Sequence, residues 1–445
     1  MRALGPGLIR VKCWVVRNFI LLLFSAAFLV KASGERGTLD PAFEKIPFDQ
    51  WLGERDQARF HWTTSVTRAE LSFHQRLMAR VEIRLDGRDL ESRRGAGELV
   101  FFVQVTGRDG SRYQNHGSIE LGKLDENIKA ANLEYSQAAF FLPGDFQLAV
   151  AILDTATGEH TIKRAQFRVA PPHDFLQDAW RDLQPVEFIG SAESPDSWYL
   201  PDIHRTLQWA ASLHSPARID VILNVASSEP VGGSRRASSD LAALIPTLKA
   251  ISQTGSSSVS EHIELLDLAR RRAVFHQDDG RDIDWPRLKA ALGEANRASI
   301  DIHSLSERHH DAQFFVSQVR SLLHTSQKPC VLVILTTPVA FESGEDLEPI
   351  SLEDLPVCRV VYIRYSGPAQ SLAPFGQQMG GRGRGSRMGG PMIRDRTPQN
   401  VVDQLAATLK PLGPKIFDVQ TPEQMSRALA DLQKALLTSD GQSSR

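Results

Sequence analysis

The fold of the C-terminal half is decided by the stretch Arg218-Ile219-Asp220-Val221-Ile222-Leu223-Asn224-Val225. Its nearly continuous apolar character is typical of a strand that is buried on both faces of a sheet. Similar runs recur at Val331–Leu335 and Val360–Ile363, and helical patterns lie between the runs. This alternation predicts a doubly wound α/β unit over residues 218–438, with a mostly parallel sheet covered by helices on both faces.

The remaining elements of this unit follow from local signals. Two strands are expected at Ile263–Leu268 and Ala273–Phe275, joined by a short basic turn, and a last strand is expected at Ile416–Val419. Helices are expected at 241–252, 285–295, 311–323, 401–409 and 422–437. Ser239-Asp240 and Asp284 are expected to cap the first two, and Thr421-Pro422-Glu423-Gln424 reads as a capping box for the last.

This order of strands and helices, with its antiparallel hairpin at 261–276, resembles the von Willebrand factor type A domain. The resemblance covers about 220 residues and implies a sheet with one antiparallel edge strand. It also implies a binding protein that holds Mg²⁺ at the carboxyl ends of the strands. In that family the metal ligands come from Asp-x-Ser-x-Ser after the first strand, from a Thr further on, and from the Asp of Leu-Thr-Asp-Gly after the fourth.

The metal-site positions that the resemblance implies are degenerate here. Asn224 stands where the first Asp is expected, Ala226 replaces the first Ser, and only Ser228 fits the pattern. Thr337 stands at the second Asp. Because Mg²⁺ takes oxygen ligands with carboxylates supplying the charge, we expect no metal and no cofactor at this edge.

Residues 60–170 predict an immunoglobulin-like or fibronectin-like β-sandwich. Leu77 to Leu85 alternates apolar and polar residues, and 99–105 and 140–169 read as further strands joined by turns such as Asp154–Gly158. Residues 33–59 are expected to be a lead-in with helical turns, 171–217 an irregular connector with a short strand pair between Pro201 and Trp209, and 439–445 a tail.

Residues 1–32 have the order of a secretory signal, with basic residues followed by a short apolar run and small residues. The alternative is an uncleaved membrane anchor. Removing this segment takes away five of the 51 Lys+Arg and none of the 53 Asp+Glu, so the remaining chain is acidic. We therefore expect an exported protein, periplasmic or extracellular, that does not bind nucleic acid.

The most unusual feature is a Gly/Arg-rich loop over residues 376–396. It contains five arginines and one aspartate, and we expect it to project from the carboxyl end of the fifth strand of the sheet and to overhang the metal-site positions at that edge. The arginines are Arg382, Arg384, Arg387, Arg394 and Arg396. One hypothesis is that they bind an anionic envelope component, a polysaccharide or an acidic protein; the other is a solvated insertion without a role.

Two further features leave alternatives open. Cys330 and Cys358 each precede a strand, and because these strands should be neighbours, the two residues are either bridged or buried as thiols. The acidic loop Asp278–Asp284 is either a Ca²⁺ site or a solvated turn, and it lacks the bidentate Glu of a calcium loop.

No hydrolase motif such as Gly-x-Ser-x-Gly or His-Glu-x-x-His occurs in the chain. A sandwich and an A-type unit behind a signal resemble the exported von Willebrand factor A-related proteins of acidobacteria. The sequence thus predicts a non-enzymatic binding, adhesion or scaffold protein. The alternatives are a metal-dependent adhesin with a rearranged site and an enzyme whose active residues at the carboxyl edge of the sheet go unrecognised.

Overall fold

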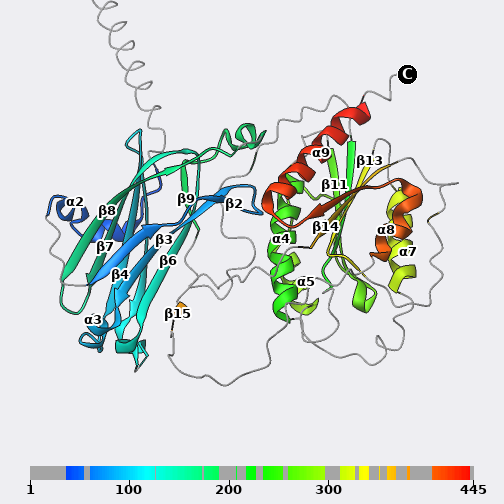
Figure 1. Cartoon of the computed structure of the whole chain (residues 1–445). Helices are drawn as coiled ribbons and strands as arrows, with labels where there is room; N and C mark the ends of the chain where they lie inside the picture. The colour runs from blue at the N-terminus through cyan, green and yellow to red at the C-terminus, as the bar shows by residue number, and fades with distance from the viewer. Residues whose placement is uncertain are drawn as a thin grey trace, which may run out of the picture.

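The computed structural model describes residues 37–54, 61–125, 127–172, 175–189, 207, 217–226, 234–253, 259–295, 311–325, 330–339, 350, 358–366, 378–380 and 403–440. In this part of the chain an N-terminal unit of antiparallel sheets lies beside a C-terminal unit in which helices flank a third sheet (Figure 1). The predicted signal segment lies outside the described residues. No helix within the described ranges is long and apolar enough to cross a membrane.

Two antiparallel sheets form the N-terminal unit. One has the order β5 (Arg112–Glu120), β4 (Glu98–Gly107), β7 (Gly144–Asp154), β8 (His160–Val169). The other has the order β1 (Trp62–Val66), β3 (Leu77–Asp86), β6 (Asn132–Phe141), β15 (Gln378–Gly380), with β2 (Glu70–Leu71) beside β3 and β9 (Val186–Phe188) beside β6. Short helices join them: α3 (Gly87–Glu91), η3 (Leu121–Lys123) and η4 (Ile128–Ala130).

The inward residues of these two sheets pack on one another. In β3 the predicted alternation is confirmed, since the odd-numbered residues from Leu77 to Leu85 are all buried. In β4 the odd-numbered residues from Leu99 to Val105 face the same core. Phe102, on the outer face of β4, is also buried, because η2 (Pro41–Lys45) and α2 (Phe48–Trp51) cover that face. This second cover explains why residues 99–105 read as a solid apolar run instead of an alternating one.

The N-terminal unit extends beyond residue 170. The range predicted as an irregular connector contains η5 (Phe175–Trp180) and strand β9, which pairs with β6. The prediction was wrong for these residues because a three-residue strand is too short to show a period of two. The strand pair predicted between Pro201 and Trp209 lies, apart from Leu207, outside the described residues.

The C-terminal unit is built on one six-stranded sheet. Its order is β12 (Arg272–Gln277), β11 (Val259–Asp267), β10 (Ala217–Asn224), β13 (Cys330–Thr336), β14 (Arg359–Tyr365), β16 (Lys415–Val419). All neighbouring strands are parallel except β12, which runs antiparallel to β11 at one edge. The predicted hairpin and the predicted apolar strands are therefore confirmed.

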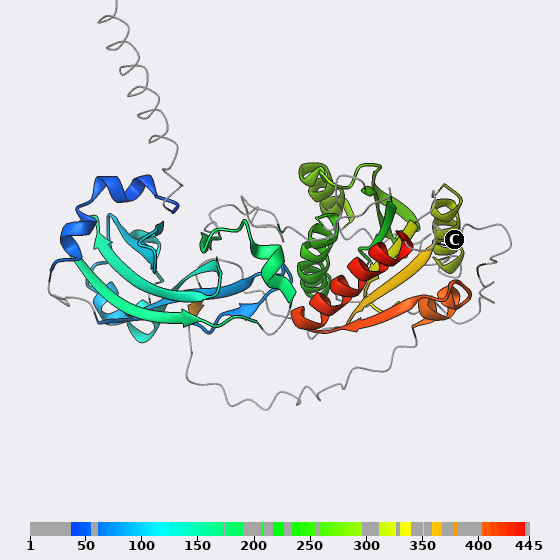
Figure 2. The same cartoon turned by 90° about the horizontal axis from the view of Figure 1, so that it is seen from above.

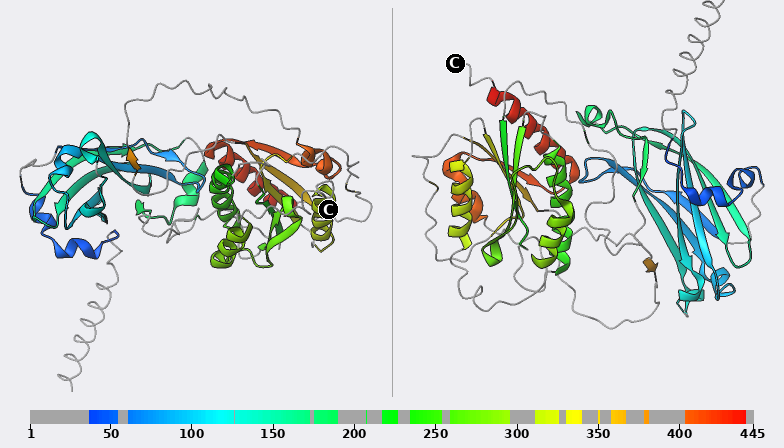
Figure 3. Two further views of the ribbon diagram at one scale, coloured as in Figure 1. Left: turned by 90° about the horizontal axis from the view of Figure 1, so that it is seen from below. Right: turned by 180° about the vertical axis from the view of Figure 1, so that it is seen from behind.

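Helices cover both faces of this sheet (Figures 2 and 3). α4 (Ser234–Ser252), α5 (Trp285–Ala295) and α9 (Pro422–Asp440) pack on one face, and α7 (Asp311–Thr325) and α8 (Gln404–Leu409) pack on the other. Two 3₁₀ turns, η6 (Leu268–Arg270) and η8 (Lys410–Leu412), join elements of the unit. α4 begins at Ser234, before its predicted cap, because the apolar periodicity that the prediction followed starts only at Leu241.

The two units contact each other through the loop that follows β2. Phe73, 6% exposed, places its ring edge-on against Tyr365 at the end of β14, with 5.4 Å between the ring centroids. A buried ion pair joins this loop to the N-terminal unit, with 2.5 Å between Arg76 Nη1 and Glu187 Oε2 of β9. The indole of Trp180 donates a hydrogen bond to the carbonyl of Gln75. The N-terminal unit therefore contacts the carboxyl end of β14.

Candidate functional site

The carboxyl ends of β10 and β13 meet at one edge of the parallel sheet. The two strands pair in parallel, with Leu223 opposite Leu335, so Asn224 and Thr336 leave the sheet side by side. In open α/β sheets this edge is where ligands bind, because the strands end there and the loops that follow supply the contacts. We call Asn224, Ala226, Thr336 and Thr337 the carboxyl-edge cluster.

Neutral hydrogen bonds join the members of this cluster. The Asn224 side chain is almost fully buried and donates from Nδ2 to Oγ1 of Thr336 at 3.0 Å. Its Oδ1 accepts the backbone N–H of Ala226 at 3.1 Å, and Thr336 Oγ1 donates to the carbonyl of Thr337 at 2.9 Å. Asn224 therefore uses both ends of its amide where the A-type pattern places a metal-binding aspartate.

Thr337 is the exception within this cluster. Its side chain is 4% exposed, yet its Oγ1 has no hydrogen-bond partner in the part of the chain that the structure describes. A buried hydroxyl without a partner costs free energy, on the order of 1–3 kcal/mol. Ser228, the fourth position singled out in the sequence, lies outside the described residues.

The neighbouring strand end is occupied by a different polar network. Asp403, the N-cap of α8, accepts hydrogen bonds from the Tyr362 hydroxyl and from Arg364 of β14, both at 2.9 Å. Arg364 also pairs with Asp418 of β16 at 2.6 Å. Burial, together with the charge of Asp403, raises the pKa of Tyr362 well above its usual value, so the hydroxyl remains a donor. This network joins α8 to two strands, which is a structural role.

One short segment of the Gly/Arg-rich loop lies on the N-terminal unit. Its residues Gln378–Gly380 form β15, which pairs antiparallel with Asn132–Glu134 of β6 in the N-terminal unit. The expectation that the loop overhangs the carboxyl edge is wrong for this segment, because an edge strand offers unpaired backbone groups that attract another strand. The five arginines lie outside the described residues, so their role stays a prediction.

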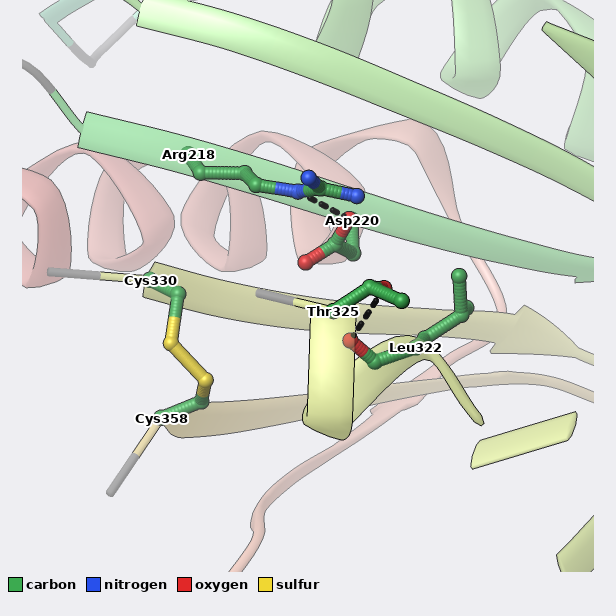
Figure 4. Close-up of a disulfide and its surroundings, with 6 residues drawn as sticks. All are labelled: Arg218, Asp220, Leu322, Thr325, Cys330 and Cys358. Carbon is green, nitrogen blue, oxygen red and sulfur yellow. Dashed lines mark hydrogen bonds and ion pairs between the residues drawn. A yellow bond between two sulfur atoms is a disulfide. The ribbon is translucent and has the colours of Figure 1, made fainter. Parts of the chain in front are cut away.

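Cys330 and Cys358 form a disulfide, one of the two alternatives left open by the sequence (Figure 4). Val331 pairs with Arg359, which places the two preceding cysteines opposite each other with a Cα–Cα distance of 4.9 Å. Figure 4 also shows the ion pair of Arg218 with Asp220 on the adjacent strand β10. The bridge fastens the amino ends of β13 and β14, at the end of the sheet away from the carboxyl-edge cluster.

The acidic loop is not organised as a calcium site. Asp279 pairs with Arg281 at 3.1 Å, and Asp284 caps α5 by accepting the N–H of Arg287. Asp278 instead contacts two histidines of the hairpin, His262 and His276. Sequence analysis missed these histidines, since they lie 14 residues apart and only the hairpin register brings them together.

Comparison with known proteins leaves the family open. No protein-family model matches the chain, and no curated protein matches it. A structure described as an ApaA protein from Bordetella pertussis has 17% identity and a TM-score of 0.18, covering 26% of this chain and 97% of its own. A glycosyl hydrolase family 2 member from Bacteroides cellulosilyticus has 10% identity and a TM-score of 0.19, and the alignment covers 69% of this chain and 42% of the hydrolase.

The pilus adhesin RrgA from Streptococcus pneumoniae is a further neighbour. It has 10% identity and a TM-score of 0.16, and the alignment covers 57% of this chain and 42% of the adhesin. At these TM-scores none of the similarities carries an argument about fold or function.

Proposed function

We propose that this chain is an exported, non-enzymatic binding protein whose C-terminal unit is a von Willebrand factor A-type domain. The order of its sheet supports this proposal. When the six strands are numbered by their order in the chain, their order across the sheet is 3-2-1-4-5-6. Strand 3, which is β12, is the antiparallel edge strand. The N-terminal unit, with two antiparallel sheets packed face to face, is proposed to be an immunoglobulin-like or fibronectin-like module.

The observation that carries the proposal is the neutral chemistry of the carboxyl-edge cluster. A divalent cation at this edge needs carboxylates, but Asn224 and Thr337 stand at both carboxylate positions, and the Asn224 amide is already hydrogen-bonded. The carboxyl-edge cluster has no charged side chain, which suits a partner that binds through neutral hydrogen-bonding groups. Binding is therefore proposed to be independent of a metal ion.

Export is the second part of the proposal. The order of charges and apolar residues in 1–32 supports a secretory signal. The disulfide between Cys330 and Cys358 supports an oxidising compartment, because such bonds persist outside the reducing cytosol.

The function is tested by affinity capture from the envelope fraction of the source cells. Captured partners are expected to stay bound in EDTA and to be lost when Ala226→Arg places a bulky cation in the carboxyl-edge cluster. Gln50→Arg is the control for the added charge, because Gln50 is exposed on α2 in the other unit, whereas Ala226 is partly buried. A partner that EDTA releases, or that binds Ala226→Arg and Gln50→Arg equally well, would contradict the proposal.

A further inference from the structure

Three potential metal ligands gather at the free edge of the C-terminal sheet, in a group separate from the carboxyl-edge cluster. They are His262 near the start of β11, His276 on β12, and Asp278 just after β12. Their ligand atoms all lie within 4.8 Å of one another, and among the described ranges this is the one group of three or more such residues. We call these three residues the hairpin cluster.

The antiparallel register of the hairpin brings the cluster together. Glu264 pairs with His276, and His262 lies two residues before Glu264 on the same face of β11. The two imidazole rings meet edge to face with 4.7 Å between their centroids. Two rings and a carboxylate from one hairpin thus converge without any contribution from a distant element.

The distances within the cluster fit a tetrahedral transition-metal site. Asp278 Oδ1 lies 3.2 Å from His262 Nδ1 and 3.5 Å from His276 Nε2. Zinc takes nitrogen and carboxylate oxygen ligands at about 2.0–2.1 Å, and tetrahedral geometry then separates two ligand atoms by roughly 3.3 Å. Both distances from the carboxylate oxygen are therefore close to those of a tetrahedral site, and the ligand atoms of the two imidazoles lie within 4.8 Å of each other.

His262 is the buried member of the hairpin cluster. His262 is 4% exposed, and its Nε2 has no hydrogen-bond partner within the described part of the chain. The nitrogen that meets Asp278 is Nδ1, so Nδ1 is the ligand atom and Nε2 is the ring nitrogen that carries the proton. Asp220 of β10 lies opposite His262 in the register and pairs with Arg218.

The loop after β12 holds Asp278 in place. The Gly280 N–H donates to the carbonyl of Glu261 at 2.8 Å, and the loop lies so close to β11 that a Cβ at Gly280 would approach Ile263 Cδ1 to 2.7 Å. Asp279, the next carboxylate, is paired with Arg281. The carboxylate of Asp278 therefore contacts the two histidines.

We propose that the hairpin cluster binds one zinc ion, through His262, His276 and Asp278. Two imidazoles and a single carboxylate favour zinc and its transition-metal neighbours over Mg²⁺ or Ca²⁺, which take oxygen ligands. Three protein ligands leave a fourth position for water or for a donor group of a partner. The ion would fasten the edge strand β12 to β11, and this site is independent of the binding function proposed above.

The test is a Zn²⁺ titration of the full chain, freed of metal and of any histidine tag, by calorimetry, with Co²⁺ absorption as a second readout. His276→Ala and Asp278→Asn are the test variants, because side-chain exposures of 54% and 86% make them compatible with folding. His61→Ala is the matched control, since it removes an exposed histidine that also pairs with a carboxylate, that of Asp89.

The wild type and His61→Ala are expected to bind one equivalent of Zn²⁺ and to give the Co²⁺ bands of a tetrahedral site. Each test variant should weaken binding at least about tenfold, or about 1.4 kcal/mol. Three results would overturn the proposal: no Zn²⁺ binding by the wild type, unchanged affinity in both test variants, or an equal loss of affinity in His61→Ala.

Discussion

Replacing Asn224 by Asp introduces the carboxylate that the A-type pattern has at this position, and we expect it to destabilise the chain. The Nδ2 that donates to Thr336 Oγ1 is lost, and the hydroxyl proton of Thr336 is already donated to the Thr337 carbonyl. The new carboxylate oxygen therefore faces an oxygen with no proton to offer. At 4% exposure it is also removed from water without a cation.

The magnitude follows from these two losses. The missing hydrogen bond costs about 1 kcal/mol, and the buried, unpaired charge brings the total to about 2–4 kcal/mol at pH 7. Burial keeps this carboxyl protonated to a higher pH in the folded state than in the unfolded state. The difference in unfolding free energy between the wild type and Asn224→Asp should therefore be smaller at pH 5 than at pH 7, by up to about 1.4 kcal/mol per pH unit.

Urea unfolding monitored by tryptophan fluorescence measures this effect at both pH values. Asn224→Ala is the control, since it loses the hydrogen bonds but introduces no charge. The reasoning is refuted if Asn224→Asp unfolds within about 0.5 kcal/mol of the wild type at pH 7, or if it is no less stable than Asn224→Ala.

Four further predictions concern the rest of the chain. Phe73→Ala should lower the free energy of unfolding by about 3–5 kcal/mol, because its buried ring packs against Tyr365, and an unchanged urea midpoint would contradict the contact between the units. Reducing the disulfide, which closes a loop with a sequence separation of 28, should cost about 3–4 kcal/mol in the same assay, and no loss would show that the bond does not constrain the unfolded chain. Burial and the charge of Lys249 lower the pKa of His74 to about 3; because the unfolded chain then binds a proton that the folded chain does not, stability should fall as the pH drops from 6.5 toward 3, and His74→Gln should flatten that slope. Replacing the five arginines of the Gly/Arg-rich loop by glutamine should abolish retention on an anionic matrix at low salt, and unchanged retention would refute their predicted role.

Sequence analysis predicted the main elements where the hydrophobic pattern is strong. The alternation at Leu77–Leu85 and the apolar run at Val331–Leu335 became β3 and β13, since burial on one face or on both determines those patterns. Strand β9 was missed because three residues carry no periodic signal. The start of α4 was misplaced, because its first turns lack the apolar spacing that marks the rest of the helix.

Sequence analysis identified one of the two candidate sites and missed the other. Asn224 and Thr337 were found because they occupy positions of a local motif that follows two strands. The hairpin cluster was missed because His262 and His276 are brought together by strand register, which no short motif encodes. The pairing of β15 with β6 could not be predicted either, because it joins segments more than 240 residues apart through backbone groups alone.

The central claim is that the carboxyl edge binds its partner without a metal ion, and a calorimetric titration of the wild-type chain with Mg²⁺ at neutral pH tests it most directly. The account predicts no saturable binding, because neutral side chains stand at both carboxylate positions, Asn224 and Thr337. Micromolar binding of Mg²⁺ that is abolished by Ser228→Ala would contradict it, because it would show that a functional metal site survives at this edge.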